Sequence, residues 1–162
     1  MKLRRVLPAV LLFVFGIPVC AQVLPPHEVD SLLTAASNAL DHWQQLAPQI
    51  HCEDAIQSQL REDCKTNVLG MGERVQDAKA QIARYRQQST PQVVHLFDAY
   101  QSFRRVLELA EDMNFTPYFY GERNQQALAE TYNNFVKING WFEGVVRESI
   151  LDAAKCSDHT RT

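Results

Sequence analysis

Residues 26–47 have the sequence PHEVDSLLTAASNALDHWQQLA, and this stretch predicts the fold class. Its apolar side chains recur every three or four residues, which places them on one face of a helix. They are Val29, Leu33, Ala36, Leu40, Trp43 and Ala47. Pro26 suits the first turn of a helix, and Pro48 cannot continue one. The stretch therefore predicts a long amphipathic helix with marked ends.

Three later segments have the same periodicity. They span about 56–88, 91–113 and 122–155. Thr90 is a natural N-cap, and the proline that follows it suits the first position of the third helix. The pair Asn139-Gly140 is typical of a turn, so we expect a kink or a break within the last segment.

Four amphipathic helices joined by short links favour antiparallel neighbours. We therefore expect an all-α fold, an up-down four-helix bundle of long amphipathic helices. Low glycine and proline content agrees with helix, since the chain has only 6 Gly and 7 Pro among 162 residues. The aromatic side chains of the four segments are expected in the core. They are Trp43, Tyr85, Phe97, Tyr100, Phe103, Tyr132, Phe135 and Phe142.

Residues 1–21 have the three parts of a cleavable secretory signal peptide. Residues 1–5 are positively charged, an apolar run of ~14 residues follows, and the run ends in small residues at 19–21. A membrane-spanning helix needs ~20 residues. An uncleaved membrane anchor and lipidation of Cys20 are the alternatives that the sequence leaves open. We expect export to the periplasm or the cell exterior, with residues 22–162 as one mature helical domain.

Cleavage would change the charge of the protein. The whole chain has 16 Lys+Arg and 19 Asp+Glu, and Lys2, Arg4 and Arg5 would leave with the signal. The mature chain would then have 13 basic and 19 acidic residues, a net charge of about −6. Such a chain repels a phosphate backbone and an anionic membrane surface. We therefore expect no nucleic-acid partner and no stable membrane span after cleavage. The expected partner is another exported or envelope protein.

Three cysteines, Cys52, Cys64 and Cys156, would remain after cleavage, and an exported protein can form disulfides. A disulfide requires Cα atoms about 4.4–6.8 Å apart, whereas Cys52 and Cys64 in one unbroken helix would lie ~18 Å apart. In an up-down bundle, however, Cys156 lies far from both. The sequence therefore favours a Cys52–Cys64 disulfide, with 53–59 as a separate short turn and the long helix beginning near Leu60. Cys156 would be a free thiol or an intermolecular bridge.

We find no motif for catalysis, a metal or a cofactor. The chain has no Gly-x-Ser-x-Gly, no Cys-x-x-Cys-His and no paired Glu-x-x-His. We therefore expect no catalytic residues, no metal and no cofactor. A zinc site formed by His51, Cys52 and Cys64 is the alternative if the disulfide is absent.

Residues 114–121, NFTPYFYG, place four aromatic side chains in a short link. One interpretation is a lid over the end of the bundle. The other is a binding patch formed by Phe115, Tyr118, Phe119 and Tyr120. The leading functional hypothesis is a non-enzymatic exported binding or interaction module. The alternative is a carrier or sensor of a small apolar ligand held between the helices, and an enzyme with an unrecognised site is a weaker third.

Overall fold

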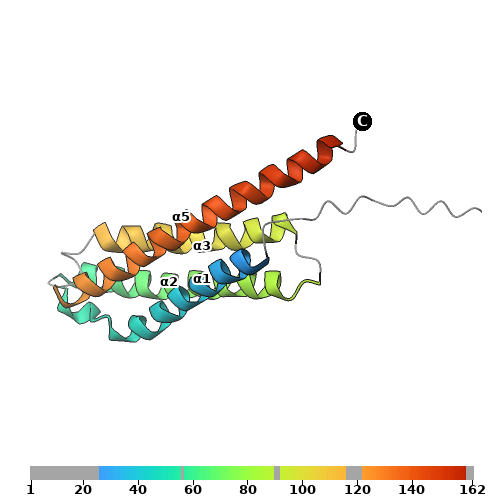
Figure 1. Ribbon diagram of the computed structural model, residues 1–162. Coiled ribbons are helices and arrows are strands. Elements are labelled where there is room, and N and C mark those ends of the chain that lie inside the picture. The colour runs from blue at the N-terminus through green and yellow to red at the C-terminus, as the bar shows by residue number, and fades with distance from the viewer. Residues whose placement is uncertain (1–25, 56, 90–91, 116–121, 160–162) are drawn as a thin grey trace, which may run out of the picture.

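The computed structural model describes residues 26–55, 57–89, 92–115 and 122–159, which contain helices and no strand. Four α-helices pack against one another, as Figure 1 shows, so the all-helical prediction is confirmed for these residues. The elements are α1 (Pro26–Leu46), the short 3₁₀-helices η1 (Ala47–Gln49) and η2 (Cys52–Asp54), α2 (Ser58–Arg86), α3 (Val93–Phe115) and α5 (Glu122–His159).

The helix ends follow the local chemistry of the chain. α1 begins at Pro26, as expected, and α2 begins at Ser58 after the separate turn of η2. α5 continues through Asn139 and Gly140, so the break expected at this pair is absent. The side chains of Ile138 and Phe142, on either side of the pair, are buried. Burial of this apolar face outweighs the cost of a helical glycine, which is only about 1 kcal/mol.

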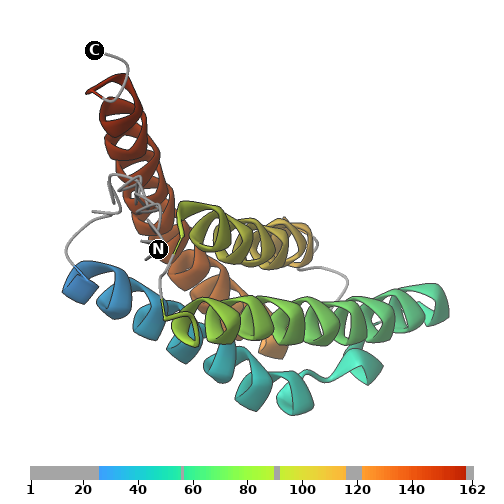
Figure 2. The ribbon, with the colours of Figure 1, turned by 90° about the vertical axis from the view of Figure 1, so that its right-hand side faces the viewer.

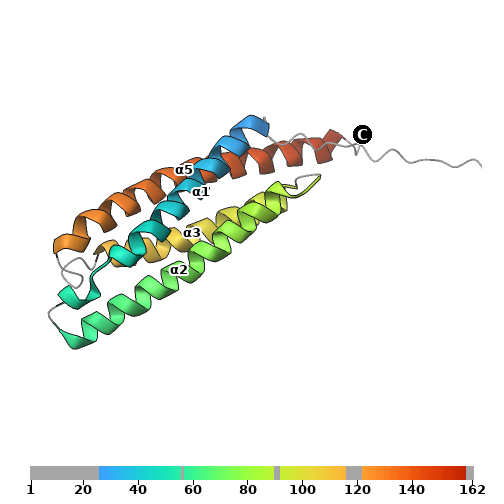
Figure 3. The same cartoon turned by 90° about the horizontal axis from the view of Figure 1, so that it is seen from below.

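Each helix has two neighbours around the bundle. α2 packs on α3, α3 packs on α5, and α1 packs on both α5 and α2. The ion pairs Asp41–Lys79 and Asp30–Arg86 join α1 to α2 and show that these two helices are antiparallel. In Figures 1, 2 and 3 the last turns of α5 project beyond the other helices.

Aromatic rings form the centre of the core. The ring of Phe103 on α3 meets that of Phe135 edge-on, with centroids 5.7 Å apart, and that of Phe142 at 6.0 Å. Phe97 was expected in this core, but it is 39% exposed. Its neighbour Leu96 is completely buried, and Phe97 lies one position further round the helix, beside Tyr100. The expectation for Phe97 is therefore wrong.

A disulfide and an asparagine hold the connection between α1 and α2. Cys52 and Cys64 are joined by a disulfide with Cα atoms 5.5 Å apart, in agreement with the expected pairing. Both sulfur atoms are used in that bond, so the alternative zinc site is wrong. The backbone N–H of His51 donates to Oδ1 of Asn124 on α5 at 3.1 Å, and Nδ2 of Asn124 donates to the carbonyl of His51 at 3.1 Å.

Candidate binding groove

Most of the aromatic patch expected from the sequence lies outside the described residues. Tyr118, Phe119 and Tyr120 fall within 116–121, and Phe115 is the last residue of α3, with its side chain also outside the description. The side chain of Cys156, on the last turns of α5, is outside it as well. The aromatic binding patch and the free or intermolecular thiol therefore stay predictions.

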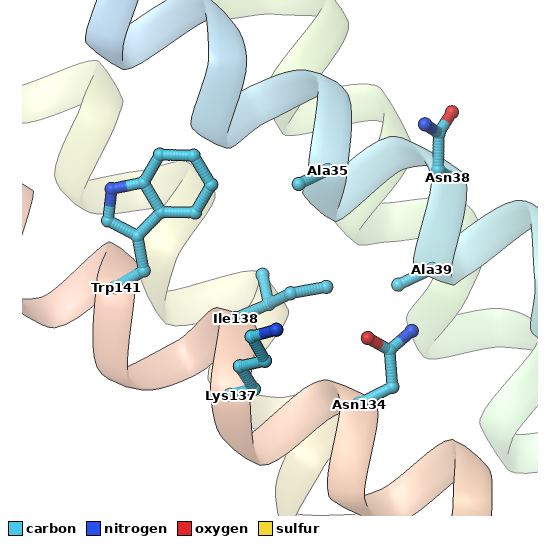
Figure 4. Close-up of a pocket in the computed structure, with 7 residues that line it drawn as sticks. All are labelled: Ala35, Asn38, Ala39, Asn134, Lys137, Ile138 and Trp141. Atoms are coloured by element: carbon cyan, nitrogen blue, oxygen red, sulfur yellow. The ribbon is translucent and has the colours of Figure 1, made fainter.

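A groove with a volume of about 480 Å³ lies between α1 and α5 (Figure 4). The volume falls in the range of about 300–1,000 Å³ that small-molecule sites occupy. Residues from both helices line it: Ala35, Asn38 and Ala39 on α1, and Asn134, Lys137, Ile138 and Trp141 on α5. The groove is thus a space of ligand size, built from two helices that are distant in sequence.

Small side chains on one helix face larger ones on the other. Ala35 and Ala39 lie one helical turn apart on α1, and their methyl groups leave open the space that a longer side chain would fill. Ile138 extends from α5 toward α1 in Figure 4. Trp141, which is 39% exposed, is in contact with both solvent and the groove. The middle and one end of the groove are therefore apolar.

Polar groups lie beside the middle of the groove and at its other end. In Figure 4, Asn134 lies at the end opposite Trp141, and Lys137 lies beside Ile138 between the two. The lining side chains supply amides, an ammonium and an indole, and include no carboxylate, histidine, hydroxyl or thiol. These groups can bind an apolar molecule and orient its polar end.

A second groove, of about 550 Å³, lies between the end of α1 and α2. Its lining includes Leu69, which is 68% exposed, and the buried Trp43, whose Nε1 has no hydrogen-bond partner within the described part of the chain. Its charged lining residue is Glu73. We regard the groove between α1 and α5 as the better candidate because it combines an apolar wall with a positive charge.

Two other features of the described residues bear on function. No group of three or more His, Cys, Asp and Glu side chains among them is arranged to hold a metal ion. None of the helices in the described ranges is both long enough and apolar enough to cross a membrane. No protein-family model, curated protein or solved structure matches the chain.

The groove was not predicted from the sequence. Ala35 and Ala39 are outside the apolar stripe of 26–47, and Trp141 is next to the stripe residue Phe142 rather than on the stripe. The sequence does contain two features of the groove. Ala35 and Ala39 are small residues one helical turn apart, and Trp141 is a large aromatic residue beside the apolar stripe of another segment. These features indicate a groove only when α1 and α5 are known to be neighbours.

Proposed function

We propose that the protein is an exported, non-enzymatic binding protein that holds an apolar group in the groove between α1 and α5. The observation that supports this most strongly is the apolar wall of Ala35 and Ala39 opposite Ile138 and the partly exposed Trp141. Exposure of a large indole to water is unfavourable, and an apolar ligand would cover it. The lining has no carboxylate, histidine, hydroxyl or thiol, and Lys137 is its single side chain of a type common in catalysis, which favours binding over catalysis.

The size of the groove favours a small apolar ligand over a protein partner. Stable protein interfaces bury roughly 800 Å² on each side and involve about 20–30 residues of each protein. Seven residues line this groove. The groove therefore supports a carrier or sensor of a small ligand. Contact with another exported or envelope protein through the aromatic patch Phe115–Tyr120 is the second candidate.

The proposal includes a location and a topology. The protein would be exported to the periplasm or the cell exterior, with residues 1–21 removed and residues 22–162 folded as an up-down four-helix bundle. The Cys52–Cys64 disulfide supports export, because disulfides persist mainly in oxidising compartments. Sequencing of the N-terminus of the exported protein tests the cleavage site, and a chain that retains Met1 would contradict it.

The neutral dye Nile red, whose emission rises in apolar surroundings, tests the groove without involving charge. We expect saturable binding to the purified mature protein. Ala35→Leu should weaken this binding at least tenfold because its side chain fills the groove. Ala80→Leu is the matched control, because Ala80 is exposed on α2 away from the groove. Equal binding by the wild-type protein and both variants would contradict the proposed site.

A further inference from the structure

Lys137 has no counter-ion among the residues that the structure describes. No ion pair or hydrogen bond joins its ammonium to any residue within the described ranges. On α5 its neighbours at three and four positions are all uncharged: Asn133, Asn134, Gly140 and Trp141. Its charge is therefore not balanced by a residue of its own helix. Arg147 differs in this respect, because it pairs with Glu143 on α5.

Two of the three carboxylates of α1 pair with α2, and the third, Glu28, lies in the first turn, seven positions before Ala35. Asp41 pairs with Lys79 of α2, and Asp30 pairs with Arg86 of the same helix. The residues that α1 contributes to the groove are two alanines and an asparagine. The lining of the groove thus contains one ammonium and no carboxylate, although the mature chain is acidic overall. The more distant carboxylates are screened, since the Debye length is about 10 Å at 0.1 M salt.

The groups from Trp141 to the middle of the groove follow the order of groups in a simple amphiphile. Trp141 forms an apolar end, and Ile138 and the ammonium of Lys137 lie side by side in the middle, with the amide of Asn134 beyond them (Figure 4). We propose that the groove binds a free fatty-acid anion. Its alkyl chain lies against Ala35, Ile138 and Trp141, and its carboxylate meets Lys137. This inference rests on the proposed function and adds the class of ligand.

An ammonium exposed to solvent contributes modestly to such a complex. Lys137 is exposed, so its ion pair with a carboxylate is weakened by water and salt. Most of the affinity therefore comes from the alkyl chain, and Lys137 selects among head groups. The expected contribution of Lys137 is about a two- to fivefold change in Kd, which lies within the range measured for exposed ion pairs.

Isothermal titration calorimetry with decanoate and decanol separates the head group from the chain. On the mature protein, Lys137→Gln should raise the Kd for decanoate about two- to fivefold and leave the Kd for decanol unchanged. Lys137→Arg should retain decanoate binding. Lys65→Gln, which removes an exposed lysine from α2, is the matched control and should change neither Kd. Added salt should weaken decanoate binding to the wild-type protein more than to Lys137→Gln.

The outcomes distinguish this inference from the proposed function. If decanol and Nile red bind but decanoate does not, or if Lys137→Gln weakens both ligands equally, the fatty-acid proposal is overturned and the apolar groove stands. If none of the three binds, both proposals are overturned. Binding to anionic vesicles without binding to monomeric decanoate would indicate that Lys137 contacts a membrane surface instead. Self-association abolished by Ala35→Leu would assign the groove to a second copy. Either result overturns the fatty-acid proposal.

Discussion

The side-chain amide of Asn124 forms two hydrogen bonds with the backbone of His51, although 73 positions separate the two residues. Asn124 lies in the first turn of α5 and is only 3% exposed, whereas His51 immediately precedes η2. An asparagine side chain has both a donor and an acceptor, so it can replace a backbone segment as partner for the N–H and C=O of one residue. This contact joins the middle of the α1–α2 connection to α5.

Asn124→Ala should therefore destabilise the fold. The substitution removes both hydrogen bonds and leaves backbone groups of His51 without these partners, so the free energy of unfolding should fall by about 1–3 kcal/mol. Urea denaturation followed by circular dichroism measures the change. Asn133→Ala, at an exposed position of the same helix, should change the free energy by less than about 0.5 kcal/mol. Equal stability of the two variants would show that the bridge contributes nothing.

Loss of the disulfide should lower stability as well. The bond closes a loop with a sequence separation of 12, and cross-links of this size contribute up to about 3 kcal/mol by restricting the unfolded chain. The double substitution Cys52→Ala with Cys64→Ala should lower the urea midpoint, and a reductant should do the same to the wild-type protein. The reductant should not affect the double variant, so a further drop there would point to another disulfide.

Gly140→Ala should stabilise the protein by roughly 0.5–1 kcal/mol. Gly140 lies inside α5, where glycine costs conformational entropy that alanine does not. A methyl group added at Gly140 would meet no atom within 4 Å outside its local helix, so no clash opposes the gain. Thermal unfolding measures the change. A lower melting temperature would show that the backbone at Gly140 adopts a conformation that alanine disfavours, and would contradict an unbroken helix at this position.

Stability should fall in alkali partly because of Tyr85. Burial raises the pKa of its phenol above the ordinary value of about 10. Below that value the phenol is protonated in both states, and its contribution to stability is complete. As the pH rises past about 10, the unfolded state loses the proton first, so the free energy of unfolding falls until the folded pKa is passed. Tyr85→Phe should reduce the slope of stability against pH in this range, and an unchanged slope would contradict the assignment.

Much of the helical organisation follows from local patterns. The apolar stripe from Val29 to Trp43 and the proline at position 26 are sufficient to place α1. Phe97 shows the limit of such patterns, because an aromatic residue beside a stripe has no sequence feature that marks it as exposed. The pairing of Cys52 with Cys64 followed from excluding the distant Cys156, so it depended on a topology as well as on spacing.

The groove depends on relations between helices. Nothing in the sequence indicates that Ala35 faces Ile138, because their proximity results from the packing of α1 on α5. The uncharged neighbours of Lys137 along α5 are visible in the sequence, whereas the pairing of Asp41 on α1 with Lys79 is known only from the folded protein. Lys137 thus becomes part of a candidate site only when its surroundings in the folded protein are known.

The emission of Trp141 tests the central claim most directly. The chain has two tryptophans, so a Trp43→Phe variant, once shown by circular dichroism to be folded, leaves Trp141 as the single indole beside the groove. Titration with decanoate below its micellar concentration should shift the emission to shorter wavelength and saturate, and Ala35→Leu in the same background should abolish the shift. An emission maximum that stays constant through the titration, while Trp141 remains accessible to the neutral quencher acrylamide, would contradict the proposed groove.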